Sequence, residues 1–226
     1  ILYQELEPEG EISGLKNRYF LTTDENDKIT QIKAYSSTNE SNKISLDIYI
    51  INKDFLIYLI RDGLASGERG SLSEVFARRV EHMKMIGYVA RDFVARIDSI
   101  KTFYQANMVI LQKEIREKLF FEPGRIYTKV KDEAPSKYMK SAVVKNSLIA
   151  DGCVIDGYVE NSIIFRGVKV VKGARVTNSI IMQGSEIQEN ATLEHVILDK
   201  EVIIRQDIRL TGQKSYLVLI DKGAIV

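Results

Sequence analysis

Histidine and cysteine often carry acid–base, nucleophilic or metal chemistry, and this chain has few of either. Its 226 residues include two histidines, His82 and His195, and one cysteine, Cys153. Because the three are isolated from one another in the sequence, we expect them to form no metal cluster. His82 lies in a polar helical segment and should be exposed. Cys153 occupies a small-residue position and should pack in a core.

A glycine-rich stretch, residues 63–70, could be mistaken for a phosphate-binding loop. It contains no Lys-Ser or Lys-Thr pair, follows no predicted strand, and lacks the G-x-G-x-x-G spacing that lets a backbone approach a phosphate. We therefore interpret it as a plain linker.

The strands expected in the first half of the chain are short and follow apolar or alternating patterns. Residues 19–23 and 28–32 predict a hairpin with a turn at residues 24–27. The β-branched, apolar run at residues 44–51 predicts a buried strand, and residues 85–97 predict a further strand region.

Helices are expected between and after these strands. A helix-start pattern at residues 52–54 predicts a first helix. A second helix should cover residues 72–79, and Ser99 should cap a third helix. Strands that alternate with helices predict an α/β layer.

The bulk composition limits the classes of partner. The chain is 45% hydrophobic, which suits one or two globular domains, and its net charge of +1 gives no reason to expect nucleic-acid or membrane binding. No apolar run is long enough for a transmembrane helix. A single cysteine excludes an internal disulfide and fits a reducing compartment, so we expect a cytoplasmic location. The start at Ile1, within an alternating pattern, suggests a fragment of a longer chain without a signal peptide.

The last third of the chain carries an imperfect repeat. Asn-Ser units followed by two aliphatic residues begin at Asn146, Asn161 and Asn178, and a weaker copy begins at Glu194, so that the starts are 15, 17 and 16 residues apart. Within each interval aliphatic residues recur every five or six positions, with Gly or Asn at corners that need left-handed backbone. An antiparallel sandwich would need turns only every ~8–12 residues. The spacing therefore predicts a parallel β-helix of stacked three-strand coils.

Domain boundaries follow from where these patterns change. Helical periodicity stops near Phe120, and Pro and Gly become frequent. We predict an α/β domain over residues 1–119, a linker over residues 120–141, and an all-β helix domain over residues 142–226. The degenerate fourth repeat suggests that residues 208–226 close the stack.

Several phrases resemble the sugar-nucleotide pyrophosphorylases, most of all the bacterial glucose-1-phosphate adenylyltransferases and their regulatory D-type subunit. They are LTTDE at 21–25, SLDIYII at 45–51, ARIDSIKTFYQAN at 95–107 and NSIIFRGVKVVKGARVTNSIIMQ at 161–183. The resemblance covers nearly the whole chain. It implies the C-terminal half of a Rossmann-like nucleotidyltransferase domain followed by a left-handed β-helix of hexapeptide repeats. It also implies a subunit of the glycogen-biosynthesis enzyme that makes ADP-glucose and pyrophosphate from ATP and glucose 1-phosphate.

The substrate motifs of active family members are altered here. The family's Gly-rich nucleotide loop is absent, and the resemblance implies that this chain begins after it. A sugar-phosphate Lys is replaced by Tyr35, and a Ser-Met-Gly triplet reads Ser45, Leu46, Asp47. The metal-binding Asp corresponds to Phe93, unless a one-residue shift in register brings in Asp92. The resemblance thus implies a vestigial sugar-phosphate site at Tyr35, Ser45 and Asp47, no catalytic residue, and no metal ligand. Mg²⁺ is expected for the holoenzyme only.

The resemblance also implies partners and regulation. We expect a hetero-oligomer with the catalytic subunit, self-association, or both. Related enzymes place basic effector-binding residues in their final segment, which makes Lys214 and Lys222 the candidates here.

Two other functions stay open. One is a catalytically competent nucleotidyltransferase that lacks its N-terminal half here. The other is a hexapeptide acyltransferase with His195 as general base. A corner or surface role for His195 is the simpler interpretation, because it stands where the repeat has Asn.

Overall fold

The computed structural model describes residues 1–226 apart from residues 7–17, 37–40, 68–69, 122–123, 125 and 128–131. It contains two compact units, Ile1–Val94 and Ala95–Val226. Among the described residues, no helix is long and apolar enough to cross a membrane.

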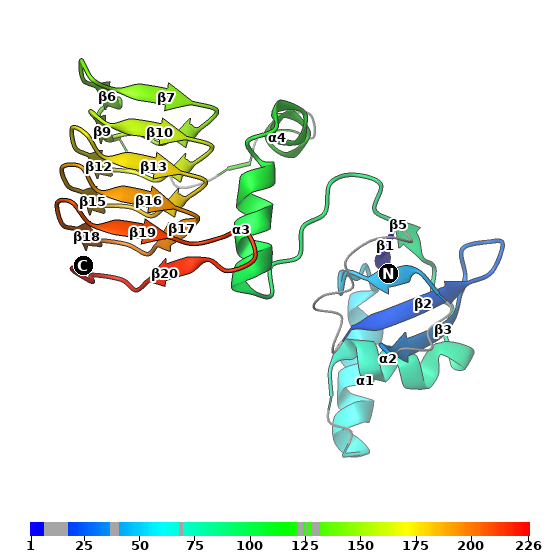
Figure 1. Ribbon diagram of the computed structural model, residues 1–226. Helices are drawn as coiled ribbons and strands as arrows, with labels where there is room; N and C mark the ends of the chain where they lie inside the picture. Colours follow the sequence, from blue (N-terminus) through cyan, green and yellow to red (C-terminus); the bar gives the residue numbers. More distant parts are fainter. Residues whose placement is uncertain (7–17, 37–40, 68–69, 122–123, 125, 128–131) are drawn as a thin grey trace. The chain divides into compact units, whose positions relative to one another are not determined.

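The first unit is built on a five-stranded sheet with strand order β3-β2-β4-β1-β5 (Figure 1). Strands β1 and β5 run parallel, and the other neighbours run antiparallel. The predicted hairpin is confirmed by the pairing of β2 with β3. The strands are β1 Leu2–Glu5, β2 Tyr19–Thr23, β3 Ile29–Ala34, β4 Lys43–Ser45 and β5 Tyr88–Val89.

Two helices, α1 (Lys53–Ala65) and α2 (Leu72–Arg79), cover one face of this sheet, and a short 3-10 turn spans Val80–His82. The Asn52 side chain accepts from the first amides of α1, and Ser71 caps α2 in the same way. The core lies between helices and sheet and consists of Tyr3, Leu21, Ile29, Ile32, Leu59, Phe76, Val80 and Met85.

Two strand predictions for this unit were too long. The strand expected over residues 44–51 ends at Ser45, and Ile48 to Ile51 continue without strand pairing. In the region of residues 85–97 only Tyr88–Val89 is strand. An apolar pattern shows which residues could form a strand, but a strand also needs a neighbouring strand to pair with. Among the described residues, most of these two segments have no such neighbour. The glycine-rich stretch is partly helical, since α1 runs to Ala65, and residues 68–69 lie outside the described residues.

The second unit begins with two helices, α3 (Ile100–Val109) and α4 (Lys113–Phe120). Ser99 caps α3 as predicted, in a reciprocal capping box with Thr102. Tyr104 of α3 packs against Ile180 and Ile197 of the β-helix. Residues 95–119, predicted to belong to the α/β domain, therefore group with the β-helix. The physical reason is the apolar face that α3 buries there.

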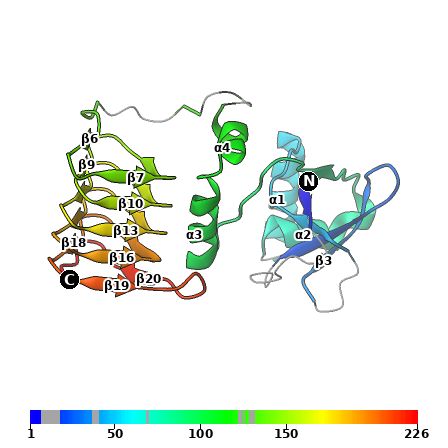
Figure 2. The same cartoon turned by 45° about the horizontal axis from the view of Figure 1, so that its top comes forward.

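The predicted β-helix is confirmed. Its short strands stack into three five-stranded parallel sheets, one for each side of the coil, which are seen in profile in Figure 2. The first sheet contains β7 Val143–Lys145, β10 Tyr158–Glu160, β13 Arg175–Thr177, β16 Thr192–Glu194 and β19 Arg209–Thr211. The second contains β8 Leu148–Ile149, β11 Ile163–Ile164, β14 Ile180–Ile181, β17 Val196–Leu198 and β20 Val218–Ile220. The third contains β6 Lys137–Tyr138, β9 Val154–Ile155, β12 Lys169–Val170, β15 Glu186–Ile187 and β18 Ile203–Ile204.

The repeat residues define one corner of the coil, called here the asparagine corner. Asn146, Asn161, Asn178 and His195 all have left-handed backbone there, with φ of 40°, 46°, 48° and 53°. Inside this corner the serines form a ladder. The amide of Ser179 donates to Ser162 Oγ at 3.1 Å, and the amide of Val196 donates to Ser179 Oγ at 3.0 Å. The Asn-Ser repeat is thus a backbone-turning residue followed by a residue that satisfies buried amides.

Candidate functional site

A group of hydroxyls surrounds one carboxylate in the first unit, and we call it the hydroxyl cluster: Ser45, Asp47, Tyr49 and Ser73. Asp47 Oδ1 accepts from Ser73 Oγ at 2.9 Å and from Tyr49 Oη at 3.2 Å. The two hydroxyl oxygens are 2.7 Å apart, and the Asp47 amide donates to Ser45 Oγ at 3.2 Å. These contacts fix the segment after β4 to the first turn of α2.

The electrostatics of the hydroxyl cluster favour a structural role for Asp47. Its carboxylate lies at the first turn of α2, where the helix dipole favours negative charge. Burial raises the pKa of the Tyr49 phenol, which therefore stays protonated and can donate. Asp47 has φ of 57°, the left-handed region suited to the Gly that active family members carry. Asp fits this backbone, and the resemblance predicts that its negative charge lies at the sugar-phosphate position of the family.

The residues predicted for a vestigial sugar-phosphate site are only partly brought together. Ser45 and Asp47 meet in the hydroxyl cluster. Tyr35 instead packs against Phe20, with ring centroids 5.9 Å apart, in a small cluster with Ile44. Because successive residues of a strand face opposite sides, Ile44 and Ser45 point away from each other. Tyr35 therefore lies on the other face of the sheet. Sequence reasoning missed Tyr49 and Ser73. Ser73 lies 26 positions from Asp47 and 24 from Tyr49, and no spacing rule links residues so far apart.

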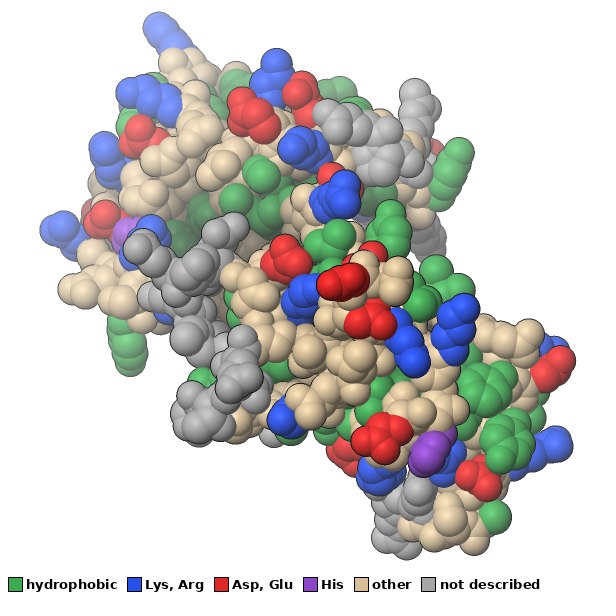
Figure 3. All heavy atoms as spheres, turned by 90° about the vertical axis from the view of Figure 1, so that its right-hand side faces the viewer, with side chains coloured by type: hydrophobic (Ala, Val, Ile, Leu, Met, Phe, Trp, Pro, Cys, Tyr) green, Lys and Arg blue, Asp and Glu red, His purple; other side chains and the backbone are tan. Residues whose placement is uncertain are grey.

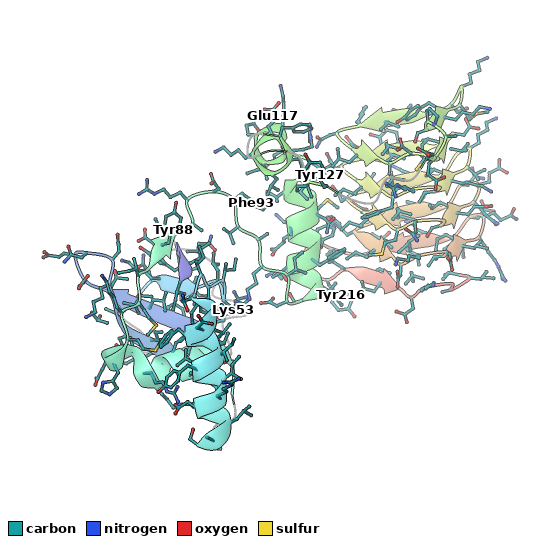
Figure 4. All side chains as sticks on the ribbon, turned by 180° about the vertical axis from the view of Figure 1, so that it is seen from behind. Lys53, Tyr88, Phe93, Glu117, Tyr127 and Tyr216 are labelled. Atoms are coloured by element: carbon teal, nitrogen blue, oxygen red, sulfur yellow. The ribbon has the colours of Figure 1, made fainter. Side chains whose placement is uncertain are left out.

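The residues at the family's metal position do not form a cation site. Phe93, labelled in Figure 4, is half-buried, and Asp92 is exposed in the same irregular segment. Within the described part of the chain, no three His, Cys, Asp or Glu residues are grouped to hold a metal ion. These residues do not fit Mg²⁺, and we derive no catalytic step through it.

The second unit has a groove of about 410 Å³ between α3 and the asparagine corner. Its floor is polar, since Asn146 Nδ2 donates to Asn161 Oδ1 at 2.7 Å and the side chain of Asn178 follows. Its wall is apolar, formed by Met108 and Leu111. A cavity of this size with a few convergent polar groups can hold a small molecule.

Tyr104 and His195 close one end of the groove. Tyr104 Oη donates to the Asn178 carbonyl at 2.7 Å, so it accepts from His195 Nδ1 at 3.1 Å. Burial raises the pKa of Tyr104 to about 12 and keeps this donor in place. His195 is half-buried, as the corner interpretation allows, and it serves as a docking contact for α3. Helical periodicity placed Tyr104 on the apolar face of its helix, but it could not show that Asn178 and His195 are its hydrogen-bond partners.

The two effector candidates lie at different corners of the coil. Lys214, in the loop between β19 and β20, lines the groove with His195. Lys222 instead pairs with Glu201 at 3.8 Å, at the corner where Gly152, Gly167 and Gly184 turn the chain. The structure therefore does not bring the two lysines into one site. His82 is exposed and Cys153 is buried, as expected.

Comparisons with known proteins agree with both units. A family model described as "GlmU-like, C-terminal hexapeptide" matches residues 131–215. The glycogen biosynthesis protein GlgD of Bacillus subtilis is 38% identical over 181 residues, covering 80% of this chain and 52% of that protein. Glucose-1-phosphate adenylyltransferases of Bacillus thuringiensis and Bacillus anthracis are 30% identical over 210 residues, covering 90% of this chain and 55% of theirs.

The chain spans about half the length of the curated relatives that it matches. The matches extend over 181 and 210 residues of this chain, which is more than the second unit, Ala95–Val226, contains, so they reach into both units. The chain belongs to the family of GlgD and the bacterial glucose-1-phosphate adenylyltransferases.

Proposed function

We propose that this chain is a regulatory, non-catalytic subunit of glucose-1-phosphate adenylyltransferase in glycogen biosynthesis. The holoenzyme would make ADP-glucose and pyrophosphate from ATP and glucose 1-phosphate. The observation that carries the proposal is the 38% identity to GlgD together with the state of the substrate positions. Asp47 is engaged by Ser73 and Tyr49 hydroxyls, and Phe93 stands where a metal carboxylate would be needed.

Phosphoryl transfer depends on positioning and on the compensation of phosphate charge by Mg²⁺ and cations. With Tyr35 in place of the sugar-phosphate Lys, this chain lacks the cation. With Phe93 in place of the metal-binding Asp, it also lacks the metal carboxylate. We therefore assign Mg²⁺ binding and catalysis to a catalytic partner subunit, and assembly and regulation to this chain.

The test is an ADP-glucose synthesis assay on the full-length protein, alone and mixed with its catalytic partner subunit. We expect background activity alone and a changed rate or effector response in the mixture. Robust activity alone would support a competent nucleotidyltransferase instead. Failure to bind or alter the partner would remove the holoenzyme role.

Lys214 remains our candidate for effector response, since it lines the groove beside the asparagine corner. Lys222 is engaged by Glu201 and serves as its matched comparison. We expect Lys214→Ala to weaken the effector response of the mixed holoenzyme more than Lys222→Ala does. Equal responses from both variants would withdraw the assignment.

The acyltransferase alternative receives less support. The relatives that cover most of this chain are GlgD and glucose-1-phosphate adenylyltransferases. His195 Nδ1 is bonded to Tyr104, so Nε2 is the ring nitrogen that would have to act as the general base. We expect no acyl transfer from acyl-coenzyme A to sugar amines or hydroxyls, measured as free thiol release.

A further inference from the structure

Helix α1 carries a line of exposed apolar side chains along one side, called here the α1 row. Ile57 is 37% exposed, Ile60 50% and Leu64 74%, whereas Leu59 and Gly63 of the same helix are buried. Single apolar side chains at a surface are ordinary, and several reach the surface between charged ones on the face shown in Figure 3. The α1 row differs from these because its members follow at intervals of three and four residues. That spacing is the one with which a helix packs against another helix.

A shallow pocket extends the α1 row toward α2. The ion pair between Asp62 and Arg79, at 2.8 Å, links α1 to α2 and so holds the walls of the pocket together. An apolar side chain from a partner can fill such a pocket, because it exchanges contact with water for van der Waals contact. The surface therefore suits a partner with apolar side chains at a matching spacing. The pocket has a volume of about 200 Å³, and its walls include Ile60, Leu64, Leu72 and Val75.

The charges beside the α1 row indicate which partner fits. Asp54 and Arg61 are both exposed and lie on the same side of the helix, two turns apart. Two turns span roughly 10 Å, which is too far for an ion pair within one helix. Two copies of α1 that run antiparallel, with Ile57 opposite Ile60, bring Asp54 of each copy beside Arg61 of the other. A parallel arrangement at the same register brings no such pair together.

We propose that α1 is a contact surface for a second copy of this chain, which binds it antiparallel about a two-fold axis. The apolar side chains of the two α1 rows interdigitate, and two Asp54–Arg61 pairs flank them. A second copy fits because one face supplies both charges that the arrangement needs, and two-fold symmetry forms the ion pair twice. One helix from each copy makes a small interface, so the contact should be weak and reversible. This inference does not rest on the proposed regulatory function.

Cross-linking between introduced cysteines tests the contact in the full-length protein. Within these 226 residues the only native cysteine, Cys153, is buried and 1% exposed. Asp54→Cys, carrying an affinity tag, is mixed with untagged Arg61→Cys and treated with a short bismaleimide. We expect a cross-linked pair of one tagged and one untagged chain. Glu25→Cys, exposed in the β2–β3 turn, is the matched control in place of Asp54→Cys and should give no such product.

The orientation of the helices is tested by mixing tagged with untagged Asp54→Cys. In the antiparallel register the two thiols stand roughly 14 Å apart along the helix axes, so we expect little product. In a parallel register they would stand at the same height and would cross-link.

Charge reversal tests the ion pairs. Asp54→Arg and Arg61→Asp each place like charges together across the contact, so each should weaken self-association by about tenfold or more. The double variant restores opposite charges and should associate as the unaltered protein does. Analytical ultracentrifugation measures the association, and far-ultraviolet circular dichroism checks that each variant is folded.

The mixed product, its absence from both controls, and recovery in the double variant together support the α1 contact. Absence of the mixed product at a concentration where the protein sediments as an oligomer overturns it, because the copies then meet elsewhere. A protein that stays monomeric, efficient cross-linking of Asp54→Cys with itself, or charge-reversed variants that associate normally would also overturn it. If Ile60→Lys abolishes binding to the catalytic partner subunit and leaves self-association unchanged, the surface serves that subunit and the proposal is wrong.

Discussion

In the β-helix, the strands of each inner coil have a parallel neighbour on both sides. Within the described residues, the backbone of the Ile48–Ile51 segment of the first unit accepts one hydrogen bond, from the Leu2 amide. Ile187 of the β-helix is 0% exposed, and Ile50 of the first unit is 92% exposed. The residue type is the same in both places. The difference lies in the distance along the sequence to the pairing partner. In the β-helix the next coil is only about 17 residues away, so contacts that are local in sequence complete each sheet. The sheet of the first unit depends on segments that are distant in sequence.

The largest expected effect tests this difference with one residue type. Ile187→Ala should destabilise the β-helix by about 2–5 kcal/mol, because it leaves a cavity between coils. Ile50→Ala in the same chain should change stability by less than about 0.5 kcal/mol, as for an exposed position. The measurement is chemical denaturation with hydrogen exchange assigned to each unit. Similar losses for both variants would show that Ile50 is buried in solution.

The serine ladder offers the next largest effect. Ser179→Ala should cost about 1–3 kcal/mol, since it leaves the buried Val196 amide without its acceptor. Ser141→Ala, at an exposed position, should be nearly neutral. Amide exchange at Val196 checks the mechanism directly. If that amide stays protected in Ser179→Ala, water or another acceptor has replaced the hydroxyl.

The docking of α3 should depend on pH through Tyr104. Its pKa is about 12 in the folded chain and near 10 when exposed, so between these values the unfolded state releases a proton that the folded state keeps. The stabilisation that Tyr104 contributes is therefore fully present below pH 10. It is lost as the pH rises from 10 through about 12.

Tyr104→Phe should remove that alkaline dependence and cost about 0.5–1.5 kcal/mol at neutral pH, through loss of the bonds to Asn178 and His195. Tyr216→Phe, 79% exposed, is the control. Tyrosinate absorbance against pH, with exchange rates of α3 amides, measures both effects. An unchanged alkaline profile in Tyr104→Phe would assign the dependence to another group.

The smallest effect is expected for a glycine at residue 47 of the hydroxyl cluster. Asp47→Gly should change stability by less than about 1 kcal/mol, because the gain of an unstrained left-handed residue offsets the lost bonds to Ser73 and Tyr49. Asp47→Ala loses the same bonds but keeps a Cβ at φ of 57°, and should be about 1–2 kcal/mol less stable than Asp47→Gly. Thermal denaturation of the two variants is the measurement. Equal stabilities would mean that the backbone at residue 47 relaxes.

Sequence alone determined the local features of this protein. The five-to-six-residue aliphatic spacing established the β-helix, the polar turn at residues 24–27 established the hairpin, and Ser99 marked the start of α3. Each depends on neighbours within about 20 residues, where pattern and backbone preference act directly.

Tertiary structure decided the rest. It ended the strand at Ser45, joined Asp47 to Ser73, and placed Tyr35 on the opposite face of the sheet. It also grouped α3 with the β-helix through Tyr104 and separated Lys214 from Lys222. These outcomes depend on which distant segments pack together, and an apolar or charged residue type does not specify its partner.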